Sequence, residues 1–395
     1  MNSSFTFFIP TRLIFGAGRL KELVRTQYLP GMKALVVIGA NGAMHRYGYL
    51  DIVISHLEAK GVDSVVYDRI QPNPLSRHVD EGAKVARDNG CDFVLGLGGG
   101  STIDSAKSIA VMATNSGQYW EYIVGGSGGK KIPLHRALPI VAIPTTAGTG
   151  TEVDPWTVIT NSDSHEKIGW GRDDTYPVLA IVDPELMLSV PPKTTAYTGM
   201  DAFFHAVEAY LSKVNQPASD LLALEAINLI SHYLPRAVED SHDLEARTKL
   251  AWASTAAGFC ESLSSCISQH SLEHAISAFY PEVPHGAGLT MLSLAYFSFL
   301  AGHSPERFPA MARAMGEDVE NLNDYSKATL FINALERLIA KVGLDTEKMS
   351  DYGIVPEDFE NLAHNAFDTM GGLFRVTPVK MSEDDVIRIF KAAYE

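Results

Sequence analysis

The chain has 395 residues, with 47 acidic residues against 32 lysines and arginines, so its formal net charge is −15. This acid excess argues against nucleic acid or an anionic membrane as a main partner, because proteins that bind polyanions usually present a basic face. Only three cysteines are present, which excludes a disulfide scaffold and favours a reducing cytoplasm.

The first half of the chain alternates short β-branched runs with stretches of helical spacing. Strands are predicted at residues 34–38, 64–67, 93–97, 140–143 and 179–182, with helices at 50–60 and 78–89. This alternation is typical of a parallel sheet covered by helices on both faces. Residues 5–13 form a further strand-like run, which could pair with the sheet edge of a second subunit.

The second half is helical in pattern and has almost no strand character. Helices are predicted at 194–212, 219–238, 244–266, 326–342 and 383–394, with Thr194 and Ser382 as N-caps. Three prolines interrupt the chain between residues 183 and 193. We therefore predict an α/β domain over residues 1–189, with a Rossmann-like parallel sheet, followed by an all-α domain over residues 190–395.

Residues 283–305 carry no formal charge and are apolar enough to be considered as a membrane span. Such a span requires about 20 predominantly apolar residues, and here Ser293, Tyr296 and Ser298 interrupt the apolar run. We interpret it as a buried core helix, and no membrane partner is expected.

A glycine-rich segment follows the predicted strand 93–97 and opens a helix. It reads Gly98-Gly99-Gly100-Ser101-Thr102-Ile103-Asp104. Glycines let the backbone approach an anion closely, and the helix N-terminus presents unpaired N–H groups, so the segment is suited to a pyrophosphate. The spacing G-x-G-x-x-G is absent, and the alternative is a turn whose glycines only let the helix pack against the sheet.

A second loop of small residues follows the predicted strand 140–143. It carries Thr145, Thr146, Thr149 and Thr151. These hydroxyls come at the carboxyl end of a parallel strand, where open α/β sheets bind ligands. The alternative is a turn whose hydroxyls make only local hydrogen bonds.

In the helix predicted over 194–212, three polar side chains share one face. Asp201, His205 and Glu208 are spaced i, i+4, i+7. From this helix alone, an ordinary Asp–His pair at i, i+4 explains the spacing better than a metal site does.

The second group of histidines favours the metal. His270 and His274 are spaced i, i+4, and His285 follows at the start of the uncharged stretch. One aspartate and three histidines form a ligand set suited to a divalent first-row metal. Cys260 and Cys266 are interpreted as small core residues, because their spacing does not place them on one helix face.

Together these segments resemble the iron-containing (group III) alcohol dehydrogenases, which have a dehydroquinate synthase-like fold. The agreement runs in consistent order from about residue 5 to the C-terminus. The matching motifs are Phe15-Gly16-Ala17-Gly18, Pro72-Asn73-Pro74, the segment from Gly98 to Lys107, Pro144-Thr145-Thr146-Ala147-Gly148-Thr149, Asp183-Pro184, Gly199-Met200-Asp201-Ala202, His205 to Tyr210, His270, His274 and Pro284-His285-Gly286.

The resemblance implies a metal centre in the second domain and a nicotinamide dinucleotide on the first. The implied metal ligands are Asp201, His205, His270 and His285, usually around Fe(II), with Zn(II) in some relatives. His274 corresponds to a histidine beside the metal, and we expect it to relay a proton or to orient a ligand. The residues expected at the dinucleotide are Asn73, Gly98, Gly99, Gly100, Ser101, Asp104, Thr145, Thr146, Thr149 and Lys167.

Two departures from the family pattern stand out. The segment between His270 and His285 is one residue longer than the commonest spacing, so the His285 loop could sit differently. Gly39 follows a strand where NAD-preferring relatives often carry an aspartate, which would bond the 2′-hydroxyl and repel a 2′-phosphate. We therefore favour NADP while leaving NAD open; the alternative is a glycine that the turn requires.

The expected function is that of a metal-dependent, NAD(P)-linked alcohol dehydrogenase or aldehyde reductase in the cytoplasm. Hydride would pass between nicotinamide and a small primary alcohol or diol whose oxygen is bound to Fe(II). Alternatives are a zinc-dependent polyol dehydrogenase of the glycerol type, a maleylacetate-type reductase and, more remotely, a non-catalytic nucleotide- or metal-binding protein. The resemblance also implies a homo-oligomer, a dimer at least.

Overall fold

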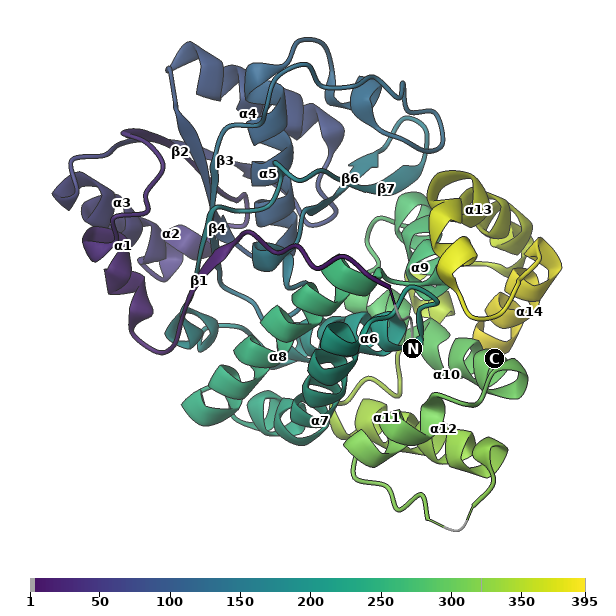
Figure 1. The fold of residues 1–395 in the computed structure, drawn as a ribbon. Coiled ribbons are helices and arrows are strands. Elements are labelled where there is room, and N and C mark those ends of the chain that lie inside the picture. The colour runs from purple at the N-terminus through teal and green to yellow at the C-terminus, as the bar shows by residue number, and fades with distance from the viewer. Residues whose placement is uncertain (1–3, 321, 395) are drawn as a thin grey trace. The chain divides into compact units, whose positions relative to one another are not determined.

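The computed structural model describes residues 4–320 and 322–394. Two compact units are present: residues 8–190, and residues 191–394 together with the segment that ends at Phe7 (Figure 1). The sequence places the boundary between residues 189 and 190 and assigns the N-terminus to the first domain. The terminal segment groups with the helices instead, where Nε2 of Gln216 donates to the carbonyl of Thr6 at 3.3 Å.

The α/β unit is built on a parallel sheet whose strand order is β1-β8-β5-β4-β2-β3. All five predicted strands are confirmed, and their buried side chains form the core with helices on both faces. The strands are β1 Arg12–Phe15, β2 Lys33–Gly39, β3 Asp63–Ile70, β4 Phe93–Gly98, β5 Ile140–Pro144 and β8 Leu179–Val182, and the helices are α1 Glu22–Arg25, α2 Ala43–Arg46, α3 Tyr49–Ala59, α4 Ser76–Asp88 and α5 Gly100–Thr114.

Two strand features differ from the prediction. Strand β1 is confined to Arg12–Phe15 and pairs in parallel with β8 of its own chain, so the predicted strand at 5–13 is largely wrong. An antiparallel hairpin, β6 Trp156–Asn161 and β7 Glu166–Gly171, was not predicted. Each of its strands is only six residues long and carries few large apolar side chains, which gives a weak period-two pattern.

The second unit is helical, as predicted. Its helices are α6 Pro192–Leu211, α7 Pro217–Glu239, α8 Leu244–Ser264, α9 Ser268–Phe279, α10 His285–His303, α11 Phe308–Ala314, α12 Asp324–Lys341, α13 Phe359–Val376 and α14 Glu383–Tyr394. The cap predicted at Thr194 is wrong, because α6 already begins at Pro192, a residue favoured at the first helical position.

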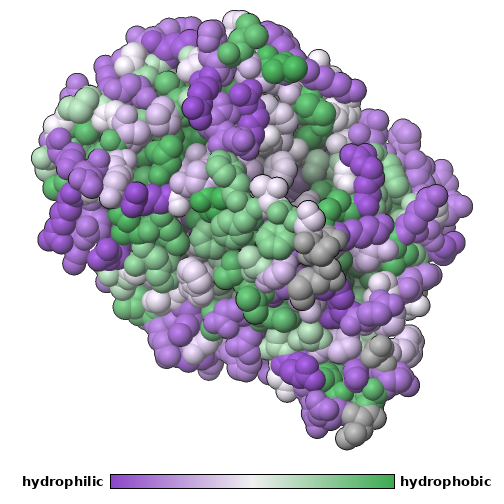
Figure 2. All heavy atoms as spheres, viewed as in Figure 1, coloured by the Kyte–Doolittle hydropathy of each residue, from purple (hydrophilic) through white to green (hydrophobic). Residues whose placement is uncertain are grey.

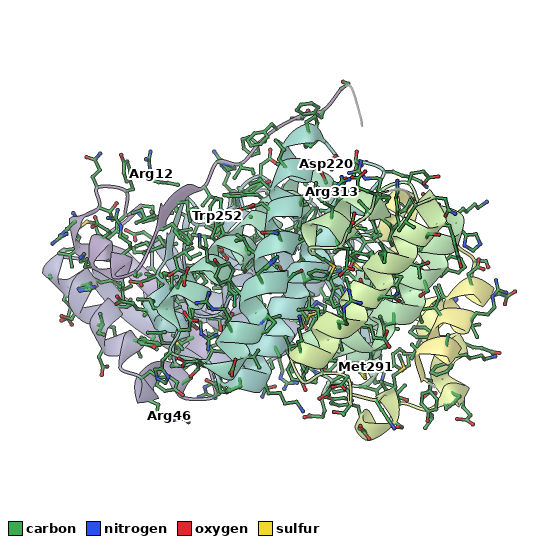
Figure 3. All side chains as sticks on the ribbon, turned by 90° about the horizontal axis from the view of Figure 1, so that it is seen from below. Arg12, Arg46, Asp220, Trp252, Met291 and Arg313 are labelled. Atoms are coloured by element: carbon green, nitrogen blue, oxygen red, sulfur yellow. The ribbon has the colours of Figure 1, made fainter. Side chains whose placement is uncertain are left out.

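Polar contacts join helices α7 and α11 of this unit, on which Figure 3 labels Asp220 and Arg313. Arg307, just before α11, donates to Asp220 at 2.7 Å, and Asn228 donates to the carbonyl of Ala314 at 2.9 Å. These contacts fix the short helix α11 against the much longer α7.

The uncharged stretch forms α10, which is packed into the helical unit as expected. Leu289, Leu292 and Phe297 are fully buried. In the described part of the chain, no helix combines the length and apolar content that a membrane span requires. Polar and apolar residues are interspersed on the face of the molecule that Figure 2 shows.

Candidate metal centre and nucleotide site

The glycine loop connects β4 to α5 with almost no space for side chains. A Cβ atom at Gly98 would lie 2.7 Å from Oγ1 of Thr102, and one at Gly100 would lie 2.3 Å from Cγ2 of Thr149. Packing alone therefore requires glycine at both positions. It also keeps the start of α5 free of bulk, so the backbone there stays open to an anion.

The threonine loop lies directly beside the glycine loop. Strands β4 and β5 are neighbours, with Gly98 opposite Pro144, and the backbone N–H of Thr145 donates to the carbonyl of Gly98 at 2.9 Å. A Cβ atom at Gly99 would lie 3.1 Å from Oγ1 of Thr146. Two loops that the sequence presents separately thus meet at the carboxyl edge of the sheet, where such sheets bind ligands.

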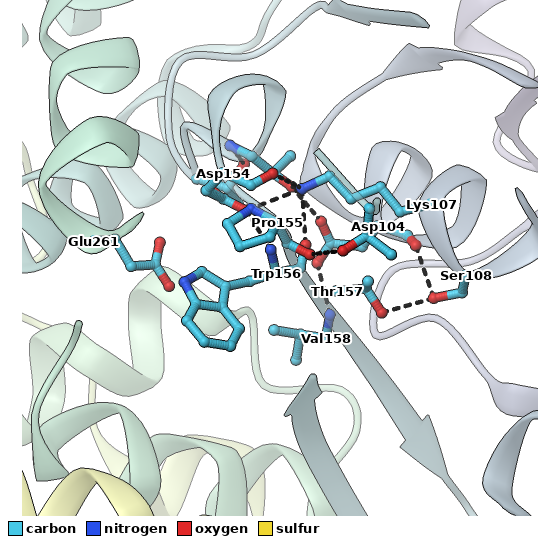
Figure 4. A network of polar contacts seen from close by, with 12 residues as sticks. Asp104, Lys107, Ser108, Asp154, Pro155, Trp156, Thr157, Val158 and Glu261 are labelled. Atoms are coloured by element: carbon cyan, nitrogen blue, oxygen red, sulfur yellow. Dashed lines mark hydrogen bonds and ion pairs between the residues drawn. The ribbon is translucent and has the colours of Figure 1, made fainter. Parts of the chain in front are cut away.

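Asp104 of α5 belongs to a network of polar contacts within the protein (Figure 4). Its Oδ1 accepts the hydroxyl of Thr151 at 2.6 Å, and its Oδ2 accepts the backbone N–H of Val158 at 2.9 Å. The side chain is buried. Both oxygens of Asp104 thus have partners within the protein, which position the loop, and its contact with the dinucleotide stays a prediction.

Lys107, one helical turn further along α5, also binds Thr151 at the end of the threonine loop. Its ammonium donates to Oγ1 of Thr151 at 2.6 Å, to the carbonyl and Oδ1 of Asp154 at 2.9 Å each, and to the carbonyl of Trp156 at 2.8 Å. The Lys107 and Asp154 side chains are 0% and 2% exposed. We call Asp104, Lys107, Thr151 and Asp154 the loop clasp, because they fasten the end of the threonine loop to α5.

The other residues expected at the dinucleotide lie on separate elements of the α/β unit. Ser101 is in the first turn of α5, and Lys167 is on β7, in register with Thr160 of β6. Asn73 follows β3 in a left-handed conformation, with φ of 51°. The N–H of Thr160 donates to the carbonyl of Pro74 at 2.8 Å, so the Asn73 loop is joined to the hairpin that carries Lys167.

Gly39 ends β2 and has room around it. A Cβ atom there would meet Asn41, Ile70 and Thr102 only at 3.6–3.8 Å, which is ordinary van der Waals contact. Gly39 is also not among the residues with positive φ. Neither the turn nor the packing requires glycine at this position.

In the helical unit, one carboxylate oxygen faces three imidazoles. Oδ1 of Asp201 lies 3.8 Å from Nε2 of His205, 3.8 Å from Nε2 of His270 and 3.5 Å from Nε2 of His285. Tetrahedral ligands at about 2.0–2.2 Å from a metal are about 3.3–3.6 Å apart. The three distances from Oδ1 of Asp201 are close to this range.

The polar atoms of this cluster fit a divalent cation. Oδ1 of Asp201 and Nε2 of His270 are buried and form no hydrogen bond with the residues described, although buried polar atoms normally have a partner. Burial acts to raise the pKa of Asp201, but His205, His285 and His270 outweigh it and bring that pKa to about 2. Asp201 is therefore an anion, and a cation would satisfy both buried atoms.

Two buried glutamates bind the far sides of two of these rings. Oε1 of Glu208 lies 2.5 Å from Nδ1 of His270, and its Oε2 accepts the N–H of Ile267 at 2.7 Å. Glu273 makes the same kind of contact with Nδ1 of His285. Both carboxylates thus occupy Nδ1 and leave Nε2 directed at Asp201. Sequence reasoning gave no role to Glu273, although its place three residues after His270 hinted at a shared helix.

His274 is buried beside the cluster. Its ring centroid lies 5.5 Å from that of His285 and 6.2 Å from that of His270. This position agrees with a histidine next to the proposed ligands, and its catalytic role stays a prediction.

Cys266 also lies at the cluster, which the sequence did not indicate. Its sulfur is within 4.8 Å of ring nitrogens of His205 and His270. Helix α8 ends at Ser264, and Ser265 has a left-handed φ of 62°, so the chain turns and brings Cys266 next to α9. Burial raises the pKa of Cys266 well above its usual value, so the group is a thiol, as a core cysteine would be.

Comparison with known proteins identifies the family. Residues 10–184 match the iron-containing alcohol dehydrogenase family, and residues 195–394 match the C-terminal region of the Fe-containing alcohol dehydrogenase family. The chain belongs to the iron-containing alcohol dehydrogenases. This membership confirms the resemblance, the fold class and the oxidoreductase class, which acts on CH–OH donors.

Individual relatives extend over the whole chain. The chain is 35% identical to an NAD-dependent methanol dehydrogenase of Bacillus methanolicus, over 98% of this chain and 99% of the relative. It is also 35% identical to a 1,3-propanediol dehydrogenase of Citrobacter freundii, over 99% of both. A crystal structure of an archaeal halo-thermophilic alcohol dehydrogenase from a Red Sea brine pool superposes with a TM-score of 0.95 at 34% identity, covering 100% of both chains.

The loop clasp predicts a strong dependence of stability on Lys107. Replacing Lys107 by Met leaves the buried carboxylate of Asp154 without its cation, and removing one partner of a buried pair costs about 3–5 kcal/mol. Urea unfolding should show a loss of this size. Lys84→Met, which removes an exposed partner of Asp88 on α4, should unfold close to wild type. Equal unfolding midpoints for the two variants would contradict a clasp.

Proposed function

We propose that this chain is a metal-dependent, NAD(P)-linked alcohol dehydrogenase or aldehyde reductase that acts on small primary alcohols or diols and their aldehydes. The observation that carries the proposal is the buried Oδ1 of Asp201, which faces Nε2 atoms of His205, His270 and His285 within 3.8 Å. The names of the methanol and 1,3-propanediol dehydrogenases support the substrate class.

Four side chains would hold Fe(II), or Zn(II) in its place: Asp201, His205, His270 and His285. The glycine and threonine loops, with Asn73 and Lys167, would hold the dinucleotide. When bound, the cation supplies Lewis acidity that lowers the pKa of an alcohol hydroxyl, and the nicotinamide supplies the hydride acceptor.

The remaining chemistry belongs to residues of this chain. Glu208 and Glu273 hold His270 and His285 by their Nδ1 atoms, so that both Nε2 atoms stay available as ligands. His274 is buried next to His285, and it would relay the alcohol proton or orient its neighbour. The N–H groups at the start of α5 would bind the pyrophosphate without requiring a basic side chain.

The metal set is tested by Asp201→Ala and His270→Ala. Each variant should lose metal during anaerobic purification and lose turnover, because either change removes one of the four proposed ligands. Metal content by mass spectrometry and absorbance at 340 nm with aldehydes give the two readouts. His303→Ala, at an exposed end of α10, should keep both. Near-normal turnover in a metal-depleted variant would refute the assignment, and the metal found distinguishes iron from zinc.

Glu208 should set metal affinity without touching the metal. Glu208→Gln keeps the size of the side chain but weakens its hold on Nδ1 of His270, and loss of such a partner typically costs about 10–100-fold in metal affinity. Competition with a chelator measures this affinity directly. Glu239→Gln, exposed at the end of α7, is the matched control. Identical affinities in the two variants would remove Glu208 from the metal centre.

We also propose that NADP is accepted, because Gly39 brings neither charge nor bulk to the end of β2. Gly39→Asp should lower kcat/KM for NADPH relative to NADH by at least about tenfold, since a carboxylate near a 2′-phosphate repels it and can bond a 2′-hydroxyl. Steady-state kinetics with both cofactors measures the ratio. An unchanged ratio would show that position 39 does not face the ribose.

Compartment and assembly stay predictions from the sequence. The three cysteines are free and buried, in keeping with a reducing cytoplasm. Phe5, Phe7 and Phe8 are exposed large apolar side chains near the N-terminus, which supports a homo-oligomer.

A further inference from the structure

An additional acidic side chain, Glu261 of α8, lies at the proposed metal cluster. Its Oε2 is 3.7 Å from Nε2 of His205, the same nitrogen that faces Oδ1 of Asp201 at 3.8 Å. Residue spacing does not reveal this contact, because Glu261 is far along the chain from both His205 and Asp201. The carboxylate comes to the cluster from α8, whereas the proposed ligands come from α6, α9 and the start of α10.

Glu261 differs from the two glutamates that orient histidines. Glu208 and Glu273 bind Nδ1 atoms, on the ring side away from Asp201, and their side chains are 0% exposed. Glu261 approaches Nε2, on the ligand side of the ring, and its side chain is 17% exposed against 6% for His205. Its carboxylate is therefore partly open to solvent and lies on the side of the ring that faces Asp201.

The cysteine next to Glu261 adds no second negative charge to this side of the cluster. Burial raises the pKa of Cys266 well above its usual value, and Glu261 raises it further, so the thiol stays neutral beside the carboxylate. A carboxylate accepts hydrogen bonds and donates none, and it attracts ammonium groups, most strongly where water is partly excluded.

We propose that Glu261 lines the alcohol site and makes the enzyme prefer short amino alcohols, whose ammonium group reaches the carboxylate while the hydroxyl is at the metal cluster. A neutral alcohol of the same size gains nothing from Glu261, and an alcohol that carries a carboxylate is repelled by it. This inference rests on the proposed function, since it names the substrate class of the same site.

Three alcohols of similar size test the charge preference: 2-aminoethanol, 1-propanol and glycolate. In wild type, kcat/KM should be highest for 2-aminoethanol and lowest for glycolate. Glu261→Gln should reduce the preference for 2-aminoethanol over 1-propanol by about tenfold, the effect of one partly screened charge pair, and should improve glycolate. Glu261→Asp, which keeps the charge, should retain the wild-type order.

Binding without turnover gives a second readout. The tertiary alcohols 1-amino-2-methylpropan-2-ol and 2-methylbutan-2-ol have nearly the same shape and carry no hydrogen on the carbinol carbon, so neither can be oxidised. Calorimetric titration of the holoenzyme should show tighter binding of the amine in wild type, and a loss of that difference of about tenfold in Glu261→Gln. Glu245→Gln, exposed at the start of α8, is the control and should preserve the difference.

The outcomes separate the two proposals. If wild type oxidises no alcohol with either nicotinamide cofactor, the proposed function fails, and the role of Glu261 fails with it. If wild type is active but Glu261→Gln changes all three alcohols by the same factor, only the inference on Glu261 is overturned. Loss of metal in Glu261→Gln would also overturn it, because the carboxylate would then belong to the ligand set.

Discussion

One carboxylate oxygen on α6 faces imidazole nitrogens of three histidines, and this contact joins three helices of the helical unit. Asp201 and His205 come from the same helix, His270 from α9 and His285 from the first residue of α10. Ionised and polar groups are costly to bury unless they are paired, so a cluster this deep persists only with further partners. Glu208 supplies one by binding Nδ1 of His270. Stability and the capacity to bind a cation thus depend on the same contacts.

The acid excess of the chain has a structural use at this cluster. Three buried carboxylates contact the histidine rings on opposite sides. Asp201 faces the Nε2 atoms, whereas Glu208 and Glu273 bind Nδ1 atoms. Glu261 adds a fourth carboxylate, near Nε2 of His205. Four carboxylates so close together would repel one another in the absence of a cation, so the arrangement of acids is itself an argument for a cationic centre.

The α/β unit is expected to bind an anion, although the protein as a whole is acidic. Its glycine loop offers backbone N–H groups at the start of α5 in place of a basic surface. Lys107, the one lysine of the glycine-rich motif, is buried in the loop clasp and forms an ion pair with Asp154. Fixing the threonine loop in this way lowers the cost of ordering it when a ligand binds.

Fold class, strand and helix positions and the four proposed ligands could be predicted from the sequence alone, because hydrophobic period and motif order are local or linear properties. The hairpin β6–β7 could not, since its pattern is weak, nor could the pairing of β1 with β8. Glu273, Cys266 and Glu261 became visible only in the tertiary structure. Their proximity to the histidines depends on how α8, α9 and α10 pack and on the turn at Ser265, and such distances between helices leave no trace in residue spacing.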